Sequence, residues 1–181
     1  MDGLIMDAEG GPDFFRGGVN EAHTYGNAMR EVANNPKKLL GISSNDIPQN
    51  LPGWLPKFNE IATKADFNSP QTYDGASASV ASRVDKAENA NAHLTIPFIP
   101  VGAGFIGTEY GGCASAQACA ERATIFIQLC KDRGYQGYSL WRWGGAPMPL
   151  WEVLNKTTAV RTTNNIKSAR TARRRHRTLR P

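Results

Sequence analysis

Residues 2–10 have the sequence Asp2-Gly3-Leu4-Ile5-Met6-Asp7-Ala8-Glu9-Gly10. An apolar run ends at two carboxylates two positions apart, and a Gly-Pro loop follows at 11–12. Alternate side chains of a strand point to one face, so Asp7 and Glu9 are expected to point the same way, with Cα atoms about 6.5–7 Å apart. Two neighbouring acids are costly to bury without a purpose. The stretch predicts a buried strand ending either in a functional acid pair or in a loop-capping Asp and a solvent-facing Glu.

Strand patterns alternate with helical patterns along the rest of the chain. Strands are expected at 3–8, 39–43, 65–72, 94–101 and 138–143, and helices at 19–34, 54–64, 77–89, 115–133 and 149–155. This alternation predicts an α/β fold in which parallel (β/α) repeats give about five strands with flanking helices. A (β/α)8 barrel needs about 250 residues. The chain therefore predicts a partial or truncated TIM barrel, its C-terminal portion without the first strands, with an open five-stranded sheet as the alternative.

The basic character of the chain is confined to one segment. The formal net charge is +5, but residues 156–181 hold nine of the 21 Lys and Arg residues and none of the 16 acids, so residues 1–155 have a net charge of −4. We expect 1–155 to form the barrel-type domain and 156–181 to be a basic, disordered tail, because the tail lacks an apolar period. Such a tail can bind nucleic acid or another anionic surface, or be an unselected extension.

The three cysteines, Cys113, Cys119 and Cys130, do not make a disulfide framework, and their spacing does not suit a zinc site. Cys119 and Cys130 lie about 16 Å apart along one expected helix, which is too far for a bond between them. We expect all three to be buried small apolar side chains. Neither a metal nor a cofactor is expected.

The sequence says little about compartment. No stretch approaches the roughly 20 apolar residues of a membrane span, so no membrane partner is expected. No basic segment precedes the first strand, so no secretory signal peptide is expected in this chain. If the N-terminus is truncated, we expect a secreted or cell-envelope protein. The oligomeric state is not predicted.

Acids, amides and aromatic side chains collect at one end of the expected strands, where barrel enzymes have their active sites. The candidates are Asp7, Glu9, Asp46, Gln71, Tyr73, Asp74, Glu109, Trp141 and Trp143. Aromatic rings beside carboxylates suit a sugar, whose CH faces stack on the rings while its hydroxyls bond to Asp and Gln. Glycoside cleavage also needs one protonated and one charged carboxyl group. The alternative for each Trp is a lid over the core.

Two segments and one tryptophan carry a resemblance to a known family. Residues 2–9 resemble the strand-four signature of the chitinase-like glycoside hydrolases of family 18, an Asp-Gly pair followed by apolar and Asp positions and a final Glu. Residues 65–75 resemble the same family's strand-six Met-x-Tyr-Asp segment, with Gln71 in place of Met. Trp141 lies where that family has its sugar-floor tryptophan. Lysozyme-like barrels of family 25 and related bacterial barrel hydrolases share an Asp-x-Glu strand end and a Pro-Gln-x-Tyr strand.

The resemblance implies a role for each matching residue. Glu9 would be the general acid that protonates the glycosidic oxygen. Asp7 would orient the acetamido group of the substrate, whose carbonyl oxygen attacks the anomeric carbon. Tyr73 would hydrogen-bond that group, and Trp141 would form the floor of the subsite. The chain departs from the family at Ile5, where the family has an Asp that shares a proton with the next acid.

Three functions are therefore open. The first is a glycoside hydrolase that acts by acid catalysis on an N-acetylhexosamine polymer such as chitin or peptidoglycan. The second is a non-catalytic carbohydrate-binding relative or inactive barrel fragment, which the departure at Ile5 favours. The third is a protein whose basic tail binds nucleic acid or another surface; apart from that tail, no nucleic-acid partner is expected.

Overall fold

The computed structural model describes residues 3–34 and 38–157. The basic tail predicted for 156–181 lies, from residue 158 on, outside the described residues. The strands are β1 Gly3–Asp7, β2 Leu39–Ser43, β3 Phe67–Asn68, β4 Val101–Ala103 and β5 Ser139–Trp141. The α-helices are α1 Val19–Ala33, α2 Trp54–Ala62, α3 Val80–Asn91 and α4 Ala116–Asp132, and residues 148–157 are also helical. Short 3-10 turns are η1 Pro48–Asn50, η2 Thr108–Tyr110 and η3 Trp143–Gly145.

The five strands are all parallel and alternate with helices, so the predicted α/β fold is confirmed. They form two open sheets, β1-β2-β3 and β4-β5, and not a closed barrel. In the first sheet Gly3 pairs with Leu39 and Asp7 with Ser43. Isolated parallel bridges, Asn68 with Phe98 and Gln71 with Val101, link the chain around β3 to the chain entering β4. Each strand therefore lies next to the strand that precedes it in sequence.

Three of the expected strands are at least three residues shorter than predicted, and the last of them is Ser139–Trp141 where 138–143 was expected. The strand expected at 65–72 is only Phe67–Asn68, and the one expected at 94–101 is replaced by Val101–Ala103. Prolines explain these two differences, because a proline has no N–H to donate to a ladder. Pro70 interrupts the first segment, and Pro97 and Pro100 interrupt the second.

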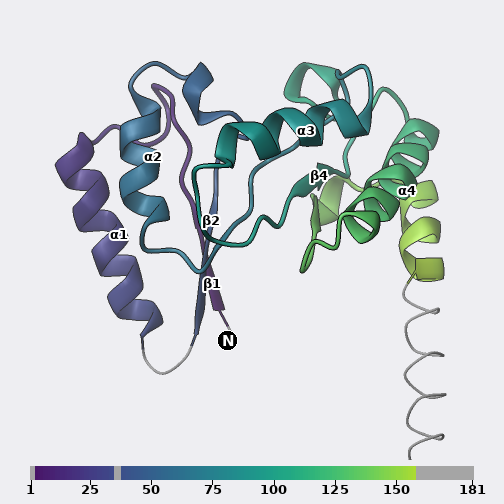
Figure 1. The fold of residues 1–181 in the computed structure, drawn as a ribbon. Helices are drawn as coiled ribbons and strands as arrows, with labels where there is room; N and C mark the ends of the chain where they lie inside the picture. The colour runs from purple at the N-terminus through teal and green to yellow at the C-terminus, as the bar shows by residue number, and fades with distance from the viewer. Residues whose placement is uncertain (1–2, 35–37, 158–181) are drawn as a thin grey trace, which may run out of the picture.

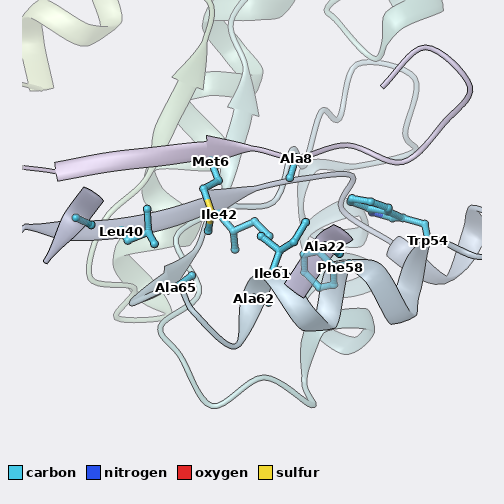
Figure 2. Packing of buried hydrophobic residues seen from close by; sticks show 11 residues of the cluster. Met6, Ala8, Ala22, Leu40, Ile42, Trp54, Phe58, Ile61, Ala62 and Ala65 are labelled. Atoms are coloured by element: carbon cyan, nitrogen blue, oxygen red, sulfur yellow. The ribbon is translucent and has the colours of Figure 1, made fainter. Parts of the chain in front are cut away.

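The main core lies between the first sheet and helices α1 and α2, which are on the same side of β1 and β2 (Figure 1). Met6, Leu40 and Ile42 point from the strands toward Phe58 and Ile61 of α2 (Figure 2). All of these side chains are buried. Burying a large apolar side chain contributes about 1.5–3 kcal/mol, so this cluster anchors the first half of the fold.

Successive side chains of β1 point to opposite faces of the first sheet, and the face away from α1 and α2 is open. Met6 is 1% exposed, whereas its neighbour Ile5 is 58% exposed. Ile5 and Asp7 therefore point away from the helices, as period-two alternation requires. In the second half, Val80 and Val84 of α3 pack with Phe126 of α4 beneath β4 and β5.

Candidate active site

A cleft of about 670 Å³ lies on the open face of the strands, near their carboxyl ends. Among its walls are residues from each strand or from the segment that follows it: Asp7, Glu9, Ser43, Gln71, Tyr73, Phe105, Glu109, Trp141 and Arg142. Six of the nine predicted site residues are among them, and the other three are described below. The carboxyl ends of parallel strands are the usual place for a site in α/β proteins.

The two acids of the first strand point into the cleft together. The side-chain amide of Gln71 donates to Oε1 of Glu9 at 2.7 Å and to Oδ1 of Asp7 at 3.3 Å. One amide nitrogen can reach both carboxylates only if they lie on the same side of the chain. The common orientation predicted from the alternation is therefore present. Asp7 is exposed and Glu9 is partly buried.

The backbone around Glu9 is held from both sides. Ala8 N donates to Ser43 O at 2.9 Å, and Gly10 N donates to Oδ1 of Asn45 at 2.9 Å. The Trp54 ring covers Gly10 so closely that a Cβ there would lie 2.4 Å from a ring carbon. Glycine is therefore required at position 10. These contacts fix the backbone on both sides of Glu9.

Gln71 is anchored through its own backbone. Its N–H donates to Ser44 O at 2.9 Å, and its bridge partners are Asn45 and Val101. The side chain is thereby placed within hydrogen-bond reach of the acids at the end of β1. Since the amide donates to the acids, it orients two carboxylates that would otherwise repel each other.

Tyr73 lies two residues beyond Gln71 and also lines the cleft. Its ring meets Phe105 edge-on, with ring centroids 5.6 Å apart. Burial, together with the nearby charges of Glu9 and Asp7, raises the pKa of Tyr73 far above its usual value. No hydrogen bond joins its hydroxyl to another residue in the described part of the chain. Tyr73 therefore offers a protonated donor to a ligand.

A closed loop forms the wall opposite β1. Residues 105–113 contribute Phe105, Ile106, Glu109 and Tyr110 to the cleft. Cys113 N donates to Phe105 O at 2.7 Å, which closes the loop on itself. Tyr110 is 75% exposed, so its ring stands at the edge of the cleft.

A disulfide bond joins Cys113 to Cys119, so the expectation that both are free apolar side chains is wrong. Cys130 is free and buried, as predicted. The expectation for Cys113 failed because the turn before α4 brings its Cα within 5.2 Å of that of Cys119, and sequence spacing does not show this turn. The bond fastens the loop wall to the first turn of α4.

Trp141, the last residue of β5, and Arg142, which follows it, also line the cleft. Trp141 is 49% exposed, which leaves much of its ring open to a ligand. Arg142 lines the same cavity and was not among the predicted site residues. Its position at the end of a predicted strand was the only sequence signal for it.

Three predicted substrate-binding residues are not among the lining residues. Asp46 is buried and pairs with Arg83 at 2.6 Å, and Asp74 is buried and pairs with Arg122 at 2.8 Å. Burial raises the pKa of Asp46, while the Arg83 charge acts in the opposite direction. Trp143 is 81% exposed and meets Trp151 edge-on, with centroids 4.4 Å apart. It stands outside the cleft, next to Arg142 in the chain.

Within residues 3–34 and 38–157, no group of three or more metal-ligating side chains occurs. The same residues include no helix that is long and apolar enough to cross a membrane. No protein-family model matches the chain, and no curated protein matches it.

Proposed function

We propose that this protein is a glycoside hydrolase of the barrel type, acting on a glycan that contains N-acetylhexosamine. The observation that carries the proposal is the acid pair held by Gln71 in a cleft that Tyr73 and Trp141 also line. These residues occupy the positions at which the chain resembles the chitinase-like family 18. The parallel strands, whose order in each open sheet follows the sequence, support a barrel-type architecture.

Each lining residue has a chemical role in this proposal. The carboxyl group of Glu9 donates its proton to the glycosidic oxygen as the bond to the anomeric carbon breaks. The carbonyl oxygen of the substrate's acetamido group forms a bond to that carbon, giving a cyclic oxazolinium ion. The Glu9 carboxylate then takes a proton from water, whose oxygen attacks the same carbon and reopens the ring. This is the substrate-assisted variant of glycoside hydrolysis.

Three other residues, Asp7, Tyr73 and Trp141, bind and orient the substrate during these steps. The Asp7 carboxylate accepts from the acetamido N–H and balances the positive charge that develops on the oxazolinium ring. The protonated Tyr73 hydroxyl donates to the acetamido oxygen and holds it below the anomeric carbon. The open ring of Trp141 stacks on the apolar face of the sugar.

The disulfide supports a role outside reducing compartments. Bonds such as Cys113–Cys119 persist in secreted and envelope proteins and are rare in the cytosol of most cells. Chitin and peptidoglycan are found outside the cytosol, which makes them suitable candidate substrates.

One observation favours a carbohydrate-binding protein without turnover as the second candidate. Ile5 lines the cleft beside Asp7 and is 58% exposed. In the chitinase-like family that the chain resembles, an Asp at this position shares a proton with the next acid. Ile5 has no acidic group, so Asp7 lacks this partner. A protein of this kind would bind the same glycans and release them intact.

The test is turnover of fluorogenic chitobiose and of peptidoglycan by the full chain and by Glu9→Gln. General acid catalysis contributes about 10²–10⁴-fold, so Glu9→Gln should lose at least about a hundredfold in kcat. Glu31→Gln, on an exposed position of α1, is the matched control and should retain full activity. Equal rates for Glu9→Gln and the full chain would overturn the proposal, and binding without turnover would favour the second candidate.

A further inference from the structure

We infer that the cleft accepts an acidic glycan, one whose sugar rings carry carboxylates, and that Arg142 binds the carboxylate. This inference rests on the proposed function and specifies its substrate class. It begins from the partners of the arginines. Arg30, Arg83, Arg122 and Arg133 each pair with a carboxylate, and Arg16 donates to the carbonyl oxygen of Pro12. Of the described arginines, Arg142 has neither an ion pair nor a hydrogen bond from its side chain.

The residue with the unpaired guanidinium is one of those that line the cleft. Arg142 lines the cavity directly after Trp141, and its side chain is exposed. The turn η3 closes on the backbone of Arg142, since Gly145 N donates to Arg142 O at 3.2 Å. A Cβ on Gly145 would lie 3.3 Å from Nε of Arg142 and 3.3 Å from Cβ of Phe105. Gly145 therefore lies close both to the arginine stem and to Phe105, another residue of the cleft wall.

The surrounding charges limit what this arginine can bind. Asp7, Glu9 and Glu109 line the same cavity, yet none of them forms an ion pair with Arg142 in the described structure. The planar guanidinium matches a carboxylate through two parallel hydrogen bonds. A densely charged anion would be repelled by the three acids, whereas a largely neutral glycan with single carboxylates would meet Arg142, the one basic residue among the described residues that line the cleft.

The geometry distinguishes this substrate from a neutral one. A chain of N-acetylglucosamine alone has hydroxyl and amide groups, which the acids, Gln71 and Tyr73 can satisfy, and it gives Arg142 no counter-ion. A chain in which alternate rings carry a lactyl ether places a carboxylate on every second sugar. Arg142 then acts as a specificity residue, because it contacts the substituent and not the reacting atoms.

The test measures binding in the Glu9→Gln background, which prevents turnover. The probes are a tetrasaccharide of N-acetylglucosamine whose alternate rings carry lactyl carboxylates, the same compound with these groups converted to neutral methyl amides, and unsubstituted chitotetraose. Titration calorimetry gives the Kd of each. An exposed ion pair contributes a factor of up to about five, so we expect the acid to bind about fivefold more tightly than the amide.

Substitution of Arg142 assigns this preference. Arg142→Gln should bind acid and amide equally, while Arg142→Lys should keep part of the preference. Arg16→Gln, which removes an arginine outside the cleft, should keep all of it. In the protein that retains Arg142, raising the salt concentration from about 0.05 to about 0.5 M should reduce the preference for the acid over the amide, because salt screens exposed charges.

The outcomes separate the two proposals. If acid, amide and chitotetraose bind with the same Kd, or if the preference survives in Arg142→Gln, the inference about Arg142 fails and the proposed function stands. If no oligosaccharide binds and none is cleaved by the chain with Glu9, the proposed function fails and the inference fails with it. Circular dichroism of each variant shows whether a loss of binding comes from unfolding; if Arg142→Gln does not fold, the Arg142→Lys and salt measurements decide.

Discussion

The side-chain amide of Gln71 donates a hydrogen bond of 2.7 Å to the carboxylate of Glu9, across 62 positions of sequence. The same nitrogen reaches Asp7 at 3.3 Å, so one residue orients both acids of the first strand. The cleft therefore depends on a contact between the segment after β3 and the end of β1. The chitinase-like family 18 has Met at the position that Gln71 matches, and Met has no N–H donor; a Pro-Gln-x-Tyr segment is instead what the chain shares with the lysozyme-like barrels.

Replacing Gln71 by Met should free both acids while keeping the volume of the side chain. A hydrogen bond to a charged group contributes about 1.5–3 kcal/mol, so we expect kcat/KM to fall by about tenfold or more. The measurement is steady-state hydrolysis of fluorogenic chitobiose. Gln49→Met is the control, because Gln49 donates to Ala90 O on the surface. An unchanged rate in Gln71→Met would show that the amide has no part in orienting Glu9.

Tyr73→Phe should lower kcat by about tenfold, because it removes one hydrogen-bond donor from the cleft. Burial, with the charges of Glu9 and Asp7, raises the pKa of the Tyr73 hydroxyl, so the folded protein keeps it protonated beyond the usual phenol range near pH 10. We therefore expect the ratio of the rate of the unsubstituted chain to that of Tyr73→Phe to be constant from about pH 7 to pH 10. A ratio that falls toward one within this range would mean that the phenol ionises there.

Arg122→Met should destabilise the fold, because it leaves the buried Asp74 carboxylate without its charged partner. Breaking a buried ion pair on one side costs about 3–5 kcal/mol. Since Arg122 keeps about a quarter of its own side chain exposed, we expect a value at the lower end, about 3 kcal/mol. Urea unfolding measures the free energy.

Arg133→Met is the matched control for this substitution. Its partners Asp85 and Glu88 are about half exposed, and exposed pairs contribute about 1 kcal/mol or less. Equal losses in Arg122→Met and Arg133→Met would contradict the interpretation that Asp74 belongs to a buried structural pair.

Removing the disulfide by a Cys113→Ser and Cys119→Ser double substitution should lower the free energy of unfolding by about 2 kcal/mol, as expected for a short closed loop. Because the bond fastens the loop that carries Glu109 and Tyr110, KM should rise as well. Thiol titration of the denatured, unreduced full chain should find one free thiol, that of Cys130. Cys130→Ala should leave the sensitivity to reductant unchanged, and three thiols before reduction would overturn the assignment.

Local patterns predicted the class of fold well. The strand at 39–43 coincides with β2, and the helix at 115–133 with α4, whose residues Cys119, Phe126 and Cys130 are buried as its periodicity indicated. The boundaries failed at Pro70, Pro97 and Pro100, where missing N–H groups shorten the ladders. Periodicity records which face of an element is buried, and it does not record how far a hydrogen-bonded ladder extends.

Local patterns also predicted one part of the candidate site and missed another. Alternation along β1 was sufficient to place Asp7 and Glu9 on one face, because neighbouring residues of a strand follow a fixed local geometry. Gln71, Tyr73 and Trp141 were expected at strand ends and Glu109 in a loop beyond one, and each lines the cleft. Asp46 and Asp74 carry the same signal, yet each is held in an ion pair with an arginine of a following helix.

What the sequence by itself determined is therefore the alternation of strands and helices, the buried faces of α2 and α4, and the shared orientation of the two acids. Only the tertiary structure decided that Arg83 and Arg122 pair with acids while Arg142 does not, that Cys113 meets Cys119, and that Gln71 reaches Glu9. The physical reason is the sequence separation over which each kind of interaction acts. Alternation and helical periodicity act over a few residues, whereas an ion pair, a disulfide or a long-range hydrogen bond depends on how distant segments pack.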